Sequence, residues 1–86
     1  MADWHRRDLS ALWHPCTQMA EHPDTLPLLA IRSGSGVWLQ DIDGNRYLDA
    51  ISSWWTNLFG HAEPRIADAI AEQARTLEHV IFAGFS

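Results

Sequence analysis

Two adjacent tryptophans, Trp54 and Trp55, are the side chains of this sequence best suited to a binding site. An indole is a flat apolar wall for a planar or aliphatic substrate, and it can hold an amine or a sulfonium by a cation–π contact. Neighbouring side chains of an extended segment face opposite ways. One indole can therefore line a cavity while the other packs in the core, and burial of both is the alternative.

The single cysteine, Cys16, lies two residues after His14. A cysteine nucleophile needs a base within reach and a third group that orients this base, and no such group is near in the sequence. We therefore interpret Cys16 as a small filler. A single cysteine also excludes an intrachain disulfide and is compatible with the reducing cytosol, so we expect a cytoplasmic protein.

Metal and phosphate sites are not supported by the spacing of the candidate ligands. A calcium loop starting at Asp41 would place Arg46 at its sixth position and Ser52 at its twelfth, where glycine and glutamate are needed. The segment 34–36 lacks the longer glycine pattern of a phosphate-binding loop, so we interpret it as a turn. The histidines form no local pair with each other or with the cysteine; they are His5, His14, His22, His61 and His79.

The composition limits the function further. All six basic residues among the 86 are arginines, so a lysine Schiff base cannot be formed by this chain. The net charge of −5 argues against a nucleic-acid binder, and the apolar runs are too short to span a bilayer. Five tryptophans are too many for a core this small. The chain is therefore part of something larger, or some indoles serve a binding site.

The periodicity of the apolar residues predicts a small α+β unit. A short helix over 4–14 ends before Pro15, and an amphipathic helix of about 13 residues begins at Pro64. Between them we predict a three-stranded antiparallel meander over 28–32, 37–41 and 46–50, with turns at 33–36 and 43–45. Residues 51–60 have no clear period, which is typical of a ligand-lining loop or a buried connector. Because 79–86 is apolar, we expect an N-terminal fragment of a longer polypeptide.

Several motifs together resemble one enzyme family. They are Trp13-His14-Pro15-Cys16-Thr17, the Gly-x-x-x-x-Asp-x-Asp-Gly-x-x-Tyr-x-Asp pattern over 36–49, Ser52-Ser53-Trp54-Trp55, and Gly60-His61 with Pro64. The glycine–aspartate pattern and Gly60-His61 are shared by class III aminotransferases. The other two motifs are more particular, and with them the chain resembles the adenosylmethionine–8-amino-7-oxononanoate aminotransferase family of biotin biosynthesis.

This resemblance implies an α/β enzyme of fold type I that depends on pyridoxal 5'-phosphate (PLP) and forms a homodimer. Residues 1–86 would be the N-terminal part of its small domain and the start of the linker to the large PLP-binding domain. The implied reaction transfers an amino group from S-adenosylmethionine to 8-amino-7-oxononanoate, with lysine as the donor in some relatives. The alternatives are another class III aminotransferase, or a non-catalytic module derived from one.

The resemblance also assigns the site residues. Trp54 matches the tryptophan that lines the family's substrate pocket, whereas Trp55 is expected to pack. Cys16 stands where the family usually has a substrate-contacting tyrosine, so a ring and a phenol hydroxyl are missing there. The family's catalytic lysine and its PLP-binding residues lie beyond residue 86, so we expect no catalytic, cofactor-binding or metal-binding residue in this chain, which alone would be inactive.

Overall fold

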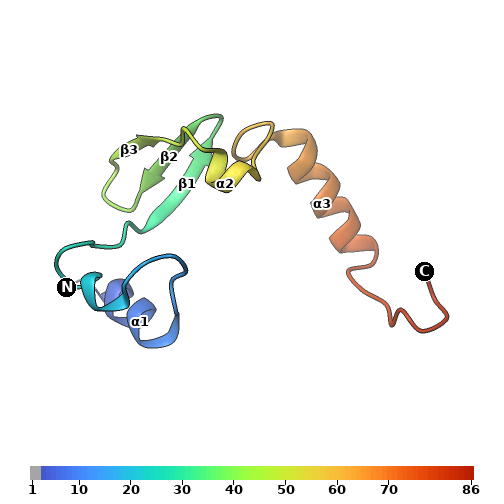
Figure 1. Cartoon of the computed structure of the whole chain (residues 1–86). Coiled ribbons are helices and arrows are strands. Elements are labelled where there is room, and N and C mark those ends of the chain that lie inside the picture. Colours follow the sequence, from blue (N-terminus) through green and yellow to red (C-terminus); the bar gives the residue numbers. More distant parts are fainter. Residues whose placement is uncertain (1–2) are drawn as a thin grey trace.

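A computed structural model describes residues 3–86 (Figure 1). The elements, in chain order, are helix α1 (Asp3–Ala11), the 3₁₀ turn η1 (Met19–Glu21), strands β1 (Ile31–Ser35), β2 (Trp38–Asp41) and β3 (Arg46–Leu48), the short turn α2 (Ser52–Trp55) and helix α3 (Pro64–Thr76). The predicted order of a helix, a three-stranded antiparallel sheet and a second helix is confirmed.

The first strand begins three residues later than predicted. Ser35 pairs with Trp38, so the hairpin loop holds only Gly36 and Val37. Gly36 has a φ of 57°, which a two-residue hairpin loop with glycine at its first position requires. This tight loop draws Gly34 and Ser35 into β1. The prediction of a turn over 33–36 was therefore wrong, because the apolar run before it suggested an earlier strand.

The turn between β2 and β3 is the hairpin expected at 43–45, and it is organised by Asp41. This side chain accepts hydrogen bonds from the backbone N–H groups of Asp43 and Asn45, from Asn45 Nδ2, and from the Tyr47 hydroxyl at 2.8 Å. Gly44 supplies the positive φ, at 91°. The carboxylate thus stabilises the turn from inside, and Asp41 is only 5% exposed.

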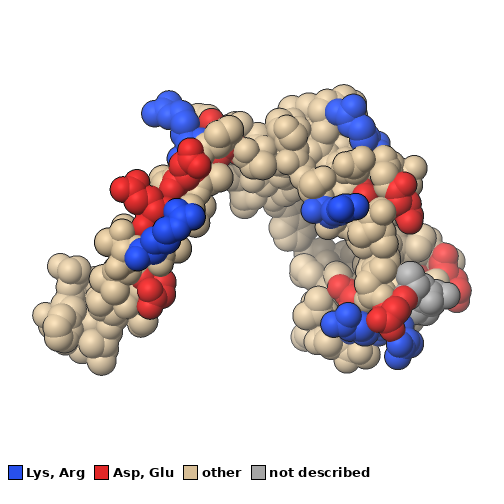
Figure 2. Space-filling model, turned by 180° about the vertical axis from the view of Figure 1, so that it is seen from behind, with Lys and Arg blue, Asp and Glu red and all other residues tan. Residues whose placement is uncertain are grey.

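Helix α3 has the start and the length that the sequence predicts. Its 13 residues begin with Pro64 at the first helical position, and the Glu63 side chain caps the helix by accepting a hydrogen bond from the Ile66 N–H at 3.1 Å. Its apolar stripe is nevertheless exposed, because α3 projects away from the sheet (Figure 1). Charged side chains are spread along this arm, and its far end, residues 79–86, carries none (Figure 2).

Residues 3–86 form an elongated arrangement without a hydrophobic core. The radius of gyration is 17.0 Å, whereas about 12 Å is expected for a compact chain of this length. No apolar side chain among the described residues is buried, and large ones such as Trp13 and Phe82 are more than four-fifths exposed. These elements are therefore shaped to pack against further protein surface. None of the helices in this part of the chain has the length and apolar character needed to cross a membrane.

Candidate functional site

The two adjacent tryptophans lie on one turn of left-handed helix. The φ angles of Ser52, Ser53, Trp54 and Trp55 are 49°, 47°, 64° and 65°. The Trp55 N–H donates to the carbonyl oxygen of Ile51 at 2.8 Å, which closes the turn. The expectation of an extended segment with alternating side chains was therefore wrong. The two indoles are carried around a helical turn, and they are 57% and 84% exposed.

Asp49 holds this turn from the side. Its Oδ1 accepts a hydrogen bond from the backbone N–H of Ser53 at 3.0 Å, and its Oδ2 accepts one from the Ser53 hydroxyl at 2.7 Å. Both bonds reach the residue immediately before Trp54. The carboxylate therefore holds the second residue of the left-handed turn, which begins at Ser52.

His61 reaches the same carboxylate from the other direction. Its Nε2 lies 2.7 Å from Asp49 Oδ2, and the two side chains are only 14% and 7% exposed. An N–H at Nε2 donates to the carboxylate. Asp49 thus accepts three hydrogen bonds, from Ser53 and His61, and is joined to a residue twelve positions later in the chain.

These hydrogen bonds also set the charge of Asp49. The backbone N–H of Ser53, followed by its hydroxyl, stabilises the carboxylate and lowers the pKa of Asp49 from 3.8 to about 2, with a smaller contribution from His61. Asp49 is therefore ionised at neutral pH, where it can hold all three donors.

The hairpin loop between β1 and β2 binds the backbone of both Asp49 and His61. The Gly36 N–H donates to the carbonyl oxygen of His61 at 3.2 Å, and the His61 N–H donates back to Gly36 at 2.8 Å. The Asp49 N–H donates to the carbonyl oxygen of Val37 at 2.8 Å. A Cβ on Gly60 would lie 3.0 Å from the Gly36 Cα, so only glycine permits this approach. Gly34 and Gly36 together allow His61 to lie close against the hairpin loop.

Sequence reasoning did not assign a site role to Asp49, Ser53 or His61. The signals were an aspartate four residues before a serine and a Gly-His pair following a Gly-x-Gly segment. Each of these signals is common by itself. Only the fold shows that they meet.

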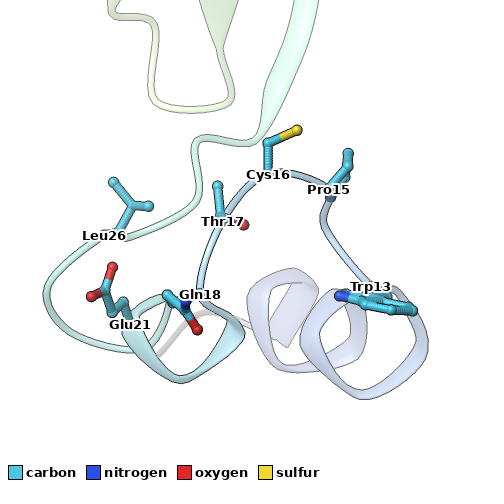
Figure 3. Close-up of a pocket in the computed structure, with 7 residues that line it drawn as sticks. All are labelled: Trp13, Pro15, Cys16, Thr17, Gln18, Glu21 and Leu26. Atoms are coloured by element: carbon cyan, nitrogen blue, oxygen red, sulfur yellow. The ribbon is translucent and has the colours of Figure 1, made fainter.

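Cys16 lies at the crest of the loop between α1 and η1, with a φ of 59° (Figure 3). Its thiol is free and exposed. The loop borders an open hollow of about 690 Å³, whose lining residues are Trp13, Pro15, Cys16, Thr17, Gln18, Glu21 and Leu26. A small side chain at this position leaves room beside the loop.

A buried histidine fixes the shape of this loop. His22 is 2% exposed; its Nδ1 lies 2.9 Å from the carbonyl oxygen of Leu26, and its Nε2 lies 2.8 Å from the Thr17 hydroxyl. The imidazole thus ties Thr17, the neighbour of Cys16, to the chain that leads into the sheet. His22 therefore has a structural role on both ring nitrogens.

The two predicted site residues are not brought together in one hollow. Trp54 is not among the residues that line the hollow beside Cys16, and α2 lies next to the end of β1 that points away from the loop carrying the cysteine (Figure 1). Both assignments therefore stay predictions. The composition also limits what this chain can contribute. It contains no lysine, so it has no amine side chain that could bond covalently to PLP.

Comparison with known proteins identifies the family of this chain. The family model described as aminotransferase class-III matches residues 19–86. The chain belongs to the class III aminotransferase family.

Similar proteins of this family cover nearly all of the chain. Adenosylmethionine-8-amino-7-oxononanoate aminotransferase of Synechococcus elongatus is 56% identical over 75 residues, which are 87% of this chain and 17% of that protein. The crystal structure of the enzyme of that name from Methanocaldococcus jannaschii matches 96% of this chain and 19% of its own, with a TM-score of 0.87 and 43% identity. The omega transaminase of Pseudomonas jessenii in complex with PMP has a TM-score of 0.84 and 27% identity, over 99% of this chain and 19% of its own. The chain thus spans about a fifth of the length of these relatives.

Proposed function

We propose that this chain is the substrate-side part of a PLP-dependent aminotransferase of biotin biosynthesis. The reaction transfers the amino group of S-adenosylmethionine to 8-amino-7-oxononanoate and yields 7,8-diaminononanoate. The observation that carries the proposal is the 56% identity to the Synechococcus elongatus enzyme of that name. It is supported by the segments Trp13–Thr17 and Ser52–Trp55, the two motifs most particular to this family.

The chemistry is divided between this chain and the rest of the enzyme. When bound, PLP supplies the electron sink for amino transfer, and the protein supplies orientation and electrostatics. Because this chain has no lysine, it takes no covalent part. Its contribution is the Trp54 indole, which offers an apolar wall to the aliphatic keto acid and a π face to the sulfonium of the donor.

The exposed apolar surface supports a place for this chain within a larger enzyme. We propose that residues 1–86 are the N-terminal part of the small domain and the start of the linker to the large domain, in a cytoplasmic homodimer of α/β fold. The absence of any buried apolar side chain among residues 3–86 supports this, because such elements need further protein to pack against.

A chimeric enzyme tests the function directly. In this chimera, residues 1–86 replace the matching segment of the Methanocaldococcus jannaschii enzyme, to which the chain is structurally similar over 96% of its length. We expect the chimera to bind PLP and to form 7,8-diaminononanoate from S-adenosylmethionine and 8-amino-7-oxononanoate, as measured by mass spectrometry. Lysine is supplied as the donor in a parallel reaction.

A second chimera is the matched control. It carries the corresponding segment of the Pseudomonas jessenii omega transaminase, which has a similar backbone but only 27% identity to this chain. We expect this control to bind PLP but not to convert 8-amino-7-oxononanoate. If neither chimera converts 8-amino-7-oxononanoate while both still bind PLP, the proposed substrate is wrong. Another class III aminotransferase is then favoured.

A further inference from the structure

The left-handed turn of α2 is costly, and the packing of its own residues does not hold it. Left-handed helical backbone costs roughly 1–2 kcal/mol per residue for residues other than glycine, and four consecutive residues of α2 have positive φ. None of the residues of α2 is buried, and the side chain of its N-cap residue, Ile51, makes no capping hydrogen bond. Such a conformation persists only where its surroundings determine it.

The polar contacts of Asp49 supply that determination. Its two oxygens hold both the N–H and the hydroxyl of Ser53, so they fix the backbone and the side chain of one residue at once. The Thr56 hydroxyl adds a bond to the Ser53 carbonyl oxygen at 3.0 Å, at the far end of the turn. The residue before Trp54 is thus bound at three of its polar groups.

His61 keeps Asp49 in this position. Its backbone is paired in both directions with Gly36 in the hairpin loop, and its ring nitrogen reaches Asp49 Oδ2. The Asp49 N–H is bonded to Val37 in the same loop. The rigid sheet therefore fixes both partners, and through them it fixes α2.

We infer that Asp49 and His61 are positioning residues, which hold α2 in its left-handed turn and so set the direction in which the Trp54 indole is presented to substrate. The part of this inference that concerns substrate rests on the proposed function. In this inference Asp49 acts through Ser53, and His61 acts through Asp49. An error in indole position of about 1 Å is enough to reduce turnover by about 100-fold in a well-ordered site.

The test compares two buried carboxylates of the same sheet region in the chimera. Asp49→Asn removes the negative charge and leaves one acceptor oxygen in place of two, so the side chain cannot accept all three hydrogen bonds from Ser53 and His61. Asp41→Asn is the matched control, because Asp41 is also buried and accepts several hydrogen bonds but organises the β2–β3 turn. His61→Leu removes the ring donor, and His61→Gln restores an N–H of similar reach.

The first readout needs no substrate. The chimera is labelled with 5-fluorotryptophan, and the ¹⁹F resonances of Trp54 and Trp55 are assigned by single Trp→Phe variants. We expect Asp49→Asn and His61→Leu to shift these two resonances and to leave the Trp38 resonance unchanged. His61→Gln should return the two resonances toward their original positions. Unchanged Trp54 and Trp55 resonances in Asp49→Asn would overturn the inference, as would equal shifts in Asp41→Asn.

The second readout is kinetic. We expect Asp49→Asn and His61→Leu to raise the KM for 8-amino-7-oxononanoate about tenfold or more, since binding relies on the indole position. Asp41→Asn should leave this KM unchanged. An equal rise of KM in Asp41→Asn would show a merely structural role and would overturn the inference. If the resonances move as expected but the unmodified chimera does not convert the keto acid, the proposed function fails while the positioning role stands.

Discussion

A Cβ atom on Gly34 would lie 2.8 Å from the Cβ of His61. Real Cβ atoms do not approach so closely, so one of the two segments would have to shift. His61 has little freedom to do so, because its backbone is paired with Gly36 on both its N–H and its carbonyl group. The absence of a side chain at Gly34 therefore determines how closely the histidine can lie against the sheet.

We predict that Gly34→Ala lowers the free energy of unfolding of the chimera by about 1–3 kcal/mol, the usual cost of overpacking. Urea unfolding followed by tryptophan fluorescence measures this change. Ser35→Ala is the control in the same strand, because the Ser35 side chain is exposed, and it should leave the midpoint unchanged. Equal midpoints of urea unfolding for the unmodified chimera and its Gly34→Ala variant would contradict the tight contact with His61.

The depressed pKa of Asp49 predicts how its contribution to stability depends on pH. The folded-state value of about 2 lies below the ordinary value of 3.8, so the unfolded chain takes up the proton first as the pH falls. The stabilisation by the carboxylate is therefore complete above about pH 4 and is lost as the pH falls toward 2.

We expect the stability difference between the chimera and its Asp49→Asn variant to be constant near neutral pH and to narrow below about pH 4. Urea unfolding at a series of pH values measures it, with the pH dependence common to both proteins cancelling in the difference. A difference that stays constant down to the acid limit of folding would mean that Asp49 is not held as a carboxylate by Ser53.

The regular elements could be predicted from the sequence because their signals are local. Pro64 at the first helical position with Glu63 before it gave the start of α3, and the apolar spacing gave its length. The turn at 43–45 followed from Asp43 and Gly44. In each case the residues that determine the element lie within or next to it.

The tryptophan turn could not be predicted because its cause lies outside it. Nothing in Ser52–Trp55 favours a positive φ, and an extended segment was the natural reading of four such residues. The turn depends on Asp49, whose position depends on His61 and on the hairpin loop at Gly36. Such long-range hydrogen bonds leave no periodic pattern in the sequence. The role of Gly34 in seating His61 was missed for the same reason.

The bond between Tyr47 and Asp41 is expected to contribute to the stability of the β2–β3 turn. The hydrogen bonds of Asn45 and Tyr47 lower the pKa of Asp41, and the same carboxylate raises the pKa of Tyr47. We predict that Tyr47→Phe destabilises the chimera, and that it does so less when Asp41→Asn is already present. A double-mutant cycle by urea unfolding gives the coupling energy. Strictly additive effects would mean that the 2.8 Å contact contributes nothing.

Trp54 is predicted to matter more for turnover than for folding. In the chimera we expect Trp54→Ala to lower kcat/KM for 8-amino-7-oxononanoate about tenfold or more, because a side chain of this size contributes a large apolar contact area. The melting temperature should change less than kcat/KM, because the proposed role of this indole is contact with substrate and not packing. Trp55→Ala is the matched neighbour, and we expect it to reduce stability more than kcat/KM. The opposite pattern would exchange the roles of the two indoles.

Cys16 offers a test by restoration, because the family resemblance of the sequence implies a tyrosine at this position. Cys16 lies at the crest of its loop beside an open hollow of about 690 Å³, so a larger ring has room there. His22 holds the loop at Thr17 through its ring nitrogen, which should keep the backbone unchanged by the substitution. We predict that Cys16→Tyr in the chimera lowers the KM for 8-amino-7-oxononanoate several-fold, because the ring restores a stacking surface.

Cys16→Phe separates the effect of the ring from that of the phenol hydroxyl, and Cys16→Ala should behave like the unmodified chimera. If Cys16→Tyr raises the KM while the midpoint of urea unfolding is unchanged, the thiol position does not lie on the substrate side of the pocket.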